Sequence, residues 1–226
     1  MPVFHHNGRM TRWSLALLVL LPACAAAQQA EPPNGLLLVA KPGLLDPNFR
    51  QTVVLVTQTP DSQTVGVILN RPTQLKLSQL LPENAPAGNY RDAVYFGGPV
   101  MRQVIVALFR SGKPPQAPAF HVLKGLYLSM HPGNIEPLLA GTDRRYRLYS
   151  GFSGWAPRQL EGELARDGWY LLPATEELVF RKDTRGMWRE LVDKALGKRT
   201  QGAAPIHVKK DRPASHGFVT RGGRSS

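Results

Sequence analysis

Apolar runs rich in β-branched residues, separated by short polar turns, constrain the fold of this chain more than any other feature of its sequence. Residues 35–40 (GLLLVA) form a short continuous apolar run, which is the composition of a buried β-strand. Residues 52–58 (TVVLVTQ) and 64–70 (TVGVILN) flank the polar turn 59–63, and this arrangement predicts a β-hairpin. The chain therefore starts a β-sheet early, and its helices have to pack on that sheet.

Shorter strand-like runs follow, and helical patterns become frequent only toward the end of the chain. Further strands are predicted at 93–96, 103–109, 120–123, 126–129, 145–150 and 169–174. Helices are predicted at 75–81, at 134–140, from about Pro157, and in a last segment that Thr184 caps and Gly197 ends. Many strands followed by late helices are typical of a single-domain α+β fold with a mainly antiparallel sheet.

The first 27 residues have the pattern of a secretory signal peptide. Arg9 and Arg12 precede the apolar run 13–23, and small residues follow it as far as Ala27. The apolar run is too short for an ordinary membrane-spanning helix. We therefore expect cleavage after Ala27 and a mature protein in the bacterial periplasm or outside the cell.

Two alternatives for this segment stay open. Residues 21–24 (LPAC) resemble a lipobox, in which Cys24 would be lipidated and would anchor the protein to a membrane. The segment would otherwise be a buried N-terminal helix of a cytoplasmic protein. The sequence also leaves open whether Met1 or Met10 is the start.

The positive charge of the chain is concentrated at its C-terminal end. Of the formal net charge of +12, residues 198–226 contribute +6, from seven Lys and Arg against one Asp. Residues 31–196 contribute only +4, from 19 Lys and Arg against 15 Asp and Glu. This distribution argues against a nucleic-acid-binding face across the whole domain. The tail is predicted to be disordered and to contact an anionic membrane surface or another acidic partner.

The sequence predicts neither a metal site nor a cofactor. Cys24 is the single cysteine, so an internal disulfide and a multi-cysteine metal site are excluded. No pair of histidines has the helical spacing of metal ligands beside an acidic residue. His131, which precedes Pro132 and Gly133, is interpreted as a loop histidine.

Four motifs carry a resemblance to a known family. In chain order they are Pro42-Gly43 with Asp46-Pro47-x-Phe49, Gly66-x-Ile68-x-Asn70-Arg71-Pro72, Gly97-Gly98-Pro99-Val100, and Gly151-Phe152-x-Gly154-Trp155-x-Pro157. Together they resemble the YqgE/AlgH family over residues 35–197. The resemblance implies an α+β domain with a bifurcated, partly barrel-like β-sheet. It implies no defined biochemical activity, although some members are called transcriptional regulators.

The chain also departs from the family pattern. Phe109 stands where the family commonly has histidine, Phe152 stands in place of tyrosine, and Ser153 in place of alanine. Any chemistry of that tyrosine or histidine would not carry over to this chain. The domain organisation that follows is a signal peptide (1–27), a linker (28–34), a YqgE/AlgH-like domain (35–197) and a basic tail (198–226).

Three turns marked by glycine or proline at strand ends supply the candidate ligand-binding residues, which are Asn70, Arg71, Gly97, Gly98, Gly154 and Trp155. The N–H groups of Gly97 and Gly98 would face an anion, and Arg71 would bind a carboxylate or a phosphate. Trp155 would stack on a ligand. The preferred alternatives are structural. Gly97 and Gly98 would form a tight turn, Arg71 would form an ion pair, and Trp155 would be a packing anchor. A pocket, if formed, is expected where the three turns converge.

The stretch Gly151–Gly154 also raises the question of a catalytic serine. A nucleophile elbow needs Gly-x-Ser-x-Gly, and here Trp155 occupies the last position. Glu161 and Glu163 cannot share one helical face at a spacing of two, so they are no obvious acid/base pair. We therefore predict that Ser153 is a turn residue that helps to cap the following helix, and we predict no catalytic residue.

Three functional hypotheses follow from the sequence. The preferred one is an exported, non-enzymatic binding or accessory module for an unknown protein or small ligand. The second is a cytoplasmic regulatory protein linked to nucleic acid, which requires that residues 1–27 do not act as a signal; nucleic acid is not an expected partner of an exported protein. The third is a hydrolase or a nucleotide-acting enzyme, for which the sequence offers no convincing nucleophile, metal cluster or phosphate loop.

Overall fold

The computed structural model describes residues 34–142 and 145–201. Its strands are β1 (Leu36–Ala40), β2 (Val53–Gln58), β3 (Thr64–Ile68), β4 (Tyr95–Phe96), β5 (Val100–Arg110), β6 (Phe120–Leu123), β7 (Leu126–Ser129), β8 (Tyr146–Trp155) and β9 (Trp169–Pro173). Its helices are α1 (Leu77–Leu80), the 3-10 helix η1 (Ala85–Asn89), α2 (Pro132–Ala140), α3 (Gln159–Ala165), α4 (Glu176–Val179) and α5 (Met187–Gln201). The predicted signal peptide with Cys24, nearly all of the linker and most of the tail lie outside the described residues.

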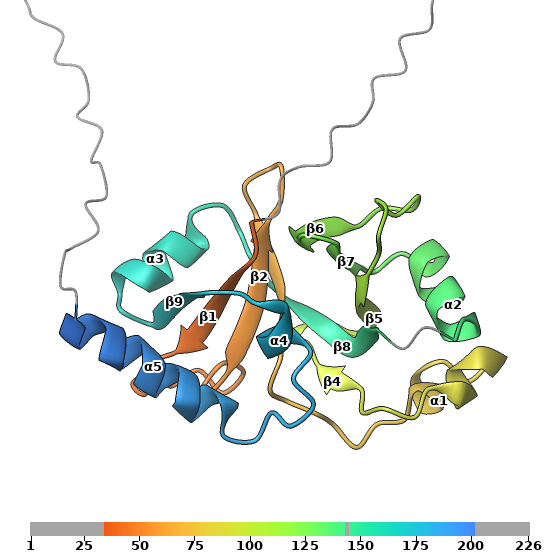
Figure 1. Ribbon diagram of the computed structural model, residues 1–226, viewed down its shortest axis with the longest axis horizontal. Helices are drawn as coiled ribbons and strands as arrows, with labels where there is room; N and C mark the ends of the chain where they lie inside the picture. The colour runs from red at the N-terminus through yellow and green to blue at the C-terminus, as the bar shows by residue number, and fades with distance from the viewer. Residues whose placement is uncertain (1–33, 143–144, 202–226) are drawn as a thin grey trace, which may run out of the picture. The chain divides into compact units, whose positions relative to one another are not determined.

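The strands of the described region form one nine-stranded sheet that branches at β8 (Figure 1). The order is β6-β7-β5-β8-β3-β2-β1-β9, and β4 pairs with β8 in addition. Strand β8 pairs with β5 between Tyr146 and Phe152 and, in parallel, with β4, whereas its last residues, from Ser153 on, pair with β3. The other pairings between these strands are antiparallel. The predicted α+β fold with a mainly antiparallel sheet is confirmed.

The predicted hairpin near the start of the chain is also confirmed. Strands β2 and β3 pair from Val54 opposite Ile68 to Gln58 opposite Thr64. The polar turn between them is closed by a 2.8 Å hydrogen bond from the Thr59 N–H to the Gln63 carbonyl oxygen. The β-branched residues on either side of the turn therefore specify both strands and their register.

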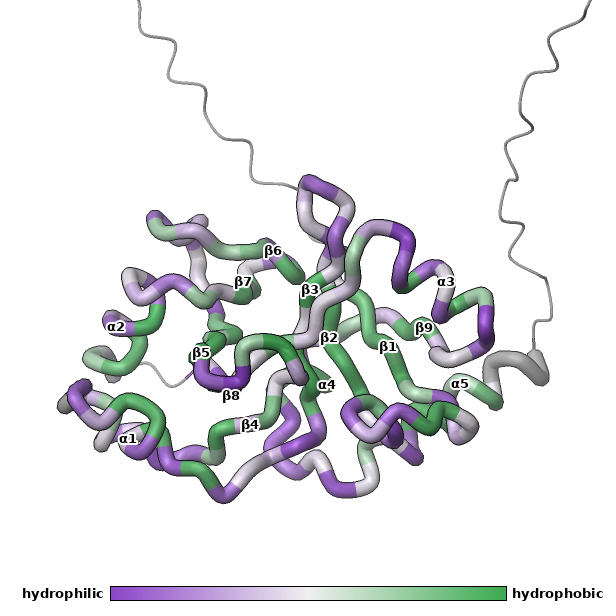
Figure 2. The backbone as a smooth tube through the Cα atoms, turned by 180° about the vertical axis from the view of Figure 1, so that it is seen from behind, coloured by the Kyte–Doolittle hydropathy of each residue, from purple (hydrophilic) through white to green (hydrophobic). Residues whose placement is uncertain are grey.

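The two branches of the sheet enclose a central apolar cluster. Successive residues of a strand point to opposite faces, so each branch also has an outer face. Leu37 and Leu55 of one branch share the central cluster with Leu108 and Tyr149 of the other, and α4 and α5 add side chains such as Met187. Figure 2 shows β1 and β2 as hydrophobic segments in the middle of this arrangement.

Helices cover both outer faces of the sheet. Leu77 of α1 and Ile135 of α2 pack with Leu148 on the outer face of β5 and β8. On the outer face of β1, β2 and β3, Leu160 and Leu164 of α3 pack against the cluster that contains Leu38, Val54, Ile68, Trp155 and Trp169. None of the helices in the described ranges combines the length and the apolar character that a membrane span needs.

The last helix differs from its prediction at the C-terminal end. The apolar stripe is buried as expected, because Met187, Leu191 and Ala195 lie in the central cluster. The helix does not end at Gly197, however, and runs to Gln201. Gly197 is absent from the residues with positive φ, so it continues the helix and does not form the left-handed cap that the prediction assumed.

Two long-range hydrogen bonds tie the ends of the sheet to distant parts of the chain. The indole N–H of Trp188 on α5 donates to the carbonyl oxygen of Ala40 on β1 at 2.6 Å. The N–H of Gly35, just before β1, donates to the carbonyl oxygen of Val122 on β6 at 2.8 Å. The second contact brings the β6 edge of one branch against the start of the other.

Candidate functional site

Gly97 and Gly98 lie where the segment between β4 and β5 crosses β8. The N–H of Gly97 donates to the Ser150 carbonyl oxygen at 3.0 Å, and the Gly97 carbonyl oxygen accepts from the Ile68 N–H at 3.0 Å. A Cβ atom on Gly97 would lie 2.1 Å from the carbonyl oxygen of Gly151, and one on Gly98 would lie 2.3 Å from that of Phe152. The two glycines therefore allow close packing of two backbones, and the Gly97 N–H is used within the sheet.

Ser153 lies inside β8 and not in a turn. It is opposite Gly66 of β3, it is fully buried, and its hydroxyl donates to the Gly97 carbonyl oxygen at 3.0 Å. Helix α3 begins only at Gln159, and Arg158 stands at its N-cap. The prediction of a turn serine that helps to cap this helix is wrong, because β8 continues through the glycines. Gly151 makes this possible with its left-handed φ of 71°.

Asn70 fixes the loop that leads into β2. Its side-chain oxygen accepts from the Val53 N–H at 2.9 Å, and its amide nitrogen donates to the Gln51 carbonyl oxygen at 2.9 Å. Gln51 has a φ of 57°, which is uncommon for a residue with a side chain. The two hydrogen bonds of Asn70 thus fix the backbone that follows Gln51, from the Gln51 carbonyl to the Val53 N–H.

Arg71 binds backbone carbonyls of the same loop. Its guanidinium donates to the carbonyl oxygens of Asn48 at 2.6 Å and of Arg50 at 2.9 Å. Within the described residues it forms no ion pair, so the preferred expectation of an ion pair is not met; the carbonyls occupy the place of the carboxylate. Burial lowers the pKa of Arg71, the charge of Arg50 lowers it further, and Asp46 acts in the opposite direction. An arginine stays charged in spite of such a shift.

Trp155 is buried, and its indole N–H shares a hydrogen-bond acceptor with that of Trp169. Both N–H groups donate to Oε2 of Glu163 on α3, at 3.1 Å from Trp155 and 2.9 Å from Trp169. The ring of Phe49 lies with its centroid 5.6 Å from each indole. This role of Glu163 was not predicted from the sequence, since no local spacing links a strand tryptophan to a helix carboxylate.

The structure brings together two of the three predicted turns. The Phe96 N–H, beside Gly97, donates to the Arg71 carbonyl oxygen at 2.8 Å. Gly154 and Trp155 lie at the other end of β3, because Trp155 is opposite Thr64, whereas Asn70 follows the end of that strand. The loop that contains Asn48 and Phe49 contacts both regions. The Asn48 carbonyl oxygen accepts from Arg71, and the Phe49 ring packs against the indole of Trp155.

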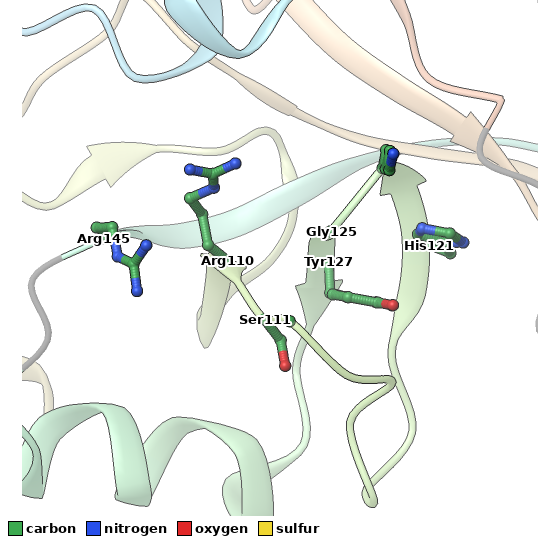
Figure 3. Close-up of a pocket in the computed structure, with 8 residues that line it drawn as sticks. Arg110, Ser111, His121, Gly125, Tyr127 and Arg145 are labelled. Carbon is green, nitrogen blue, oxygen red and sulfur yellow. The ribbon is translucent and has the colours of Figure 1, made fainter.

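A pocket of about 790 Å³ lies in a different part of the fold, around the end of β5 and the β6–β7 hairpin (Figure 3). We call it the basic pocket. Among the described residues, it is lined by Arg110, Ser111, Gly112, His121, Lys124, Gly125, Tyr127 and Arg145. This pocket could not be predicted from the sequence, because its residues belong to separate elements and form no motif.

The basic pocket has a strongly positive lining. Its described lining residues include Arg110, Lys124 and Arg145 and no carboxylate. Arg110 forms an ion pair with Glu176, at the start of α4, with a distance of 2.6 Å between Nη2 and Oε2. The rings of His121 and Tyr127 stack at a centroid distance of 4.8 Å and form an aromatic part of the wall.

The described residues contain no group of three or more His, Cys, Asp or Glu that could hold a metal ion. His131 has a local structural contact. It stands at the N-cap of α2, where its Nδ1 accepts from the Gly133 N–H at 3.0 Å.

Comparisons with known proteins agree on one family. A family model described as AlgH-like matches residues 37–200. A UPF0301 protein of Thermobifida fusca is 34% identical over 174 residues, which cover 73% of this chain and 88% of that protein. The UPF0301 protein of Mycobacterium avium is 34% identical over 165 residues, which cover 70% and 80%.

Solved structures show the same similarity. The solution structure of the AlgH protein from Pseudomonas aeruginosa has a TM-score of 0.59 at 27% identity, and the match covers 76% of this chain and 94% of that one. A crystal structure of a protein from Corynebacterium diphtheriae has a TM-score of 0.56 at 26% identity, with coverage of 73% and 87%.

Proposed function

The chain belongs to the AlgH-like family, and we propose that it is an exported member that acts as a non-enzymatic binding or accessory module in the bacterial periplasm. The sequence before the domain supports export. The family model begins at residue 37, so the signal-like residues 1–27 precede the domain and leave a short linker. The basic start, the apolar run and the small residues before Ala27 are the features that export machinery recognises.

One observation supports a binding module over an enzyme. The polar groups that the sequence offers for chemistry are engaged in holding the domain's own backbone. The Ser153 hydroxyl binds the Gly97 carbonyl, the Asn70 amide binds the loop at Gln51, and the Arg71 guanidinium binds the carbonyl of Asn48. These groups build a rigid scaffold, and the basic pocket lies outside that set.

The mass of the mature N-terminus from fractionated native cells tests export. We expect a chain that starts at Gln28 in the soluble periplasmic fraction. An acylated Cys24 in the membrane fraction would keep the protein outside the cytoplasm but make it a lipoprotein. An intact start at Met1 or Met10 in the cytoplasm would contradict the proposal, and salt-dependent binding to nucleic acid would then be the next measurement.

The basic tail is proposed to strengthen binding to an anionic surface. Because α5 extends to Gln201, a deletion that tests the tail should begin at residue 202 and leave the helix whole. The deletion variant should lose salt-sensitive binding to vesicles that contain anionic lipid and should unfold at the same temperature as the full mature chain. Unchanged vesicle binding would remove the tail from the proposal.

A further inference from the structure

We propose that the basic pocket binds a small oxyanion, such as a molecule that carries phosphate or carboxylate groups. The inference deepens the proposed function, because it rests on the protein being a binding module and names the class of its ligand. It starts from three cationic side chains, those of Arg110, Lys124 and Arg145, that the fold brings to one pocket.

Arg110 and Arg145 occupy opposite positions at the ends of two neighbouring strand segments. The N–H of Arg110, the last residue of β5, donates to the carbonyl oxygen of Arg145, just before β8, at 3.1 Å. This pairing brings two arginine side chains to the lining of one pocket (Figure 3).

Lys124 brings a third positive charge to the pocket from the β6–β7 hairpin. Leu123 pairs with Leu126, so Lys124 and Gly125 form a two-residue turn, and Gly125 has a left-handed φ of 69°, which glycine adopts at no steric cost. The Ser111 N–H donates to the Gly125 carbonyl oxygen at 2.9 Å and fixes the turn beside the end of β5. The backbone positions of Lys124 and Arg110 are therefore set before any ligand binds.

The described lining of the pocket suits an anion, because it contains cationic side chains and no carboxylate. Glu176, which stands outside that lining, pairs with Arg110. Arg110, with about a third of its side chain exposed, keeps access to solvent. Guanidinium groups bind the paired oxygens of carboxylate and phosphate in a planar, two-point geometry, and a lysine ammonium adds a point charge.

The size of the pocket suits a small molecule. Its volume of about 790 Å³ lies within the range of roughly 300–1,000 Å³ that is usual for small-molecule sites. The stacked rings of His121 and Tyr127 give one wall an apolar surface. A ligand with charged oxygens at one end and a less polar body would match both parts of this lining.

Titration calorimetry of the purified mature chain tests the inference, with inorganic pyrophosphate and citrate as probes at constant ionic strength. We expect saturable binding of at least one probe. Lys124→Gln should weaken it about tenfold, the loss that removal of one charge-assisted hydrogen bond produces. The double variant Lys124→Gln with Arg145→Gln should weaken it further. Lys194→Gln on α5 is the matched control, because it removes the same charge from an exposed site outside the pocket.

The outcomes separate the inference from its alternatives. A preference for pyrophosphate would identify a phosphate ligand, and a preference for citrate a carboxylate ligand. Equal binding in the Lys124→Gln and Lys194→Gln variants, or no saturable binding of either probe, would overturn the inference. Lys124 lies in an exposed turn, so thermal melts should show that its variant is folded. A negative result with a mature start at Gln28 would remove the ligand class and leave export in place.

Discussion

The backbone of Gly97 lies against that of Gly151 so closely that a Cβ atom on Gly97 would be 2.1 Å from the Gly151 carbonyl oxygen. The contact joins the segment before β5 to the middle of β8, where the sheet branches. It explains why two glycine-containing motifs, separated by about fifty residues of chain, occur in one sequence.

The first prediction concerns this crossing. Gly97→Ala should lower the free energy of unfolding by about 1–3 kcal/mol, because neighbouring backbone cannot move aside as a flexible side chain would. Gly43→Ala is the control, since a Cβ there meets nothing within 4 Å. Urea unfolding measures the change in stability of both variants, provided that the m-value stays that of the parent protein. Equal stability of the two variants would contradict the described crossing.

The second prediction concerns the carboxylate that two indoles share. Glu163→Ala should cost about 2 kcal/mol or more, because it leaves the buried N–H groups of Trp155 and Trp169 without their acceptor. Tryptophan fluorescence should change in the folded state as well. Glu161→Ala removes an exposed carboxylate from the first turn of the same helix and should cost no more than about 1 kcal/mol. If the two variants were equally stable, the shared acceptor would have no structural role.

The third prediction separates a structural from a ligand-binding role of Arg71. Arg71→Met should lower stability by about 2 kcal/mol, since the carbonyls of Asn48 and Arg50 lose a charged donor. Hydrogen exchange should become faster for the Val53 amide and its neighbours. Arg50→Met, at an exposed side chain, should change both quantities little. A stable Arg71→Met variant with unchanged exchange would return Arg71 to the candidates for ligand binding.

The fourth prediction concerns alkaline pH. Burial raises the pKa of Tyr149 to about 12, against the opposing effect of the Arg147 charge. Because the folded-state pKa is above the unfolded value of about 10, the stabilisation is complete below pH 10 and is lost as pH rises toward 12. The loss from Tyr149 should amount to about 2–3 kcal/mol.

Tyr149→Phe provides the control for this prediction. The Tyr149 hydroxyl lies near Arg147 but makes no hydrogen bond of normal geometry among the described residues, so the variant should keep nearly full stability at neutral pH. Its loss of stability at alkaline pH should be smaller than that of the parent protein. Part of this loss should remain, because burial also raises the pKa of Tyr90. Denaturant unfolding at several pH values, followed together with tyrosinate absorbance, measures both effects; an identical alkaline loss in both proteins would count against the prediction.

The sequence was sufficient for the elements whose side-chain pattern is strong and local. The β2–β3 hairpin and the apolar stripe of α5 follow from β-branched runs and from helical periodicity. The extension of β8 was not predictable in this way, because Gly151 and Gly154 suggest a turn when their neighbours are unknown. In the fold, β3 and β5 supply the pairing that keeps these residues in a strand.

The candidate site was less accessible to sequence reasoning than the fold. Glycine and arginine in a motif suggest ligand contacts, but a backbone crossing or a set of loop carbonyls needs the same residue types, as Gly97 and Arg71 show. The basic pocket depends on Arg110, Lys124 and Arg145, which the sheet register brings together. No short stretch of the sequence shows that these three residues lie together, since their proximity arises from pairing between strands.

The hydrogen bond from Trp188 to Ala40 also bears on the timing of folding. It spans 148 positions along the chain. Strand β1 likewise pairs along its second edge with β9, which is the last strand of the chain to be synthesised among the described residues. Folds with such a high contact order form slowly, because distant segments must meet before the gain in contacts offsets the loss of chain entropy. A ribosome has to release almost the whole domain before this sheet can close. We therefore expect the newly made chain to remain unfolded for longer than a helical bundle of the same length, a state in which it could still be threaded through a translocation channel.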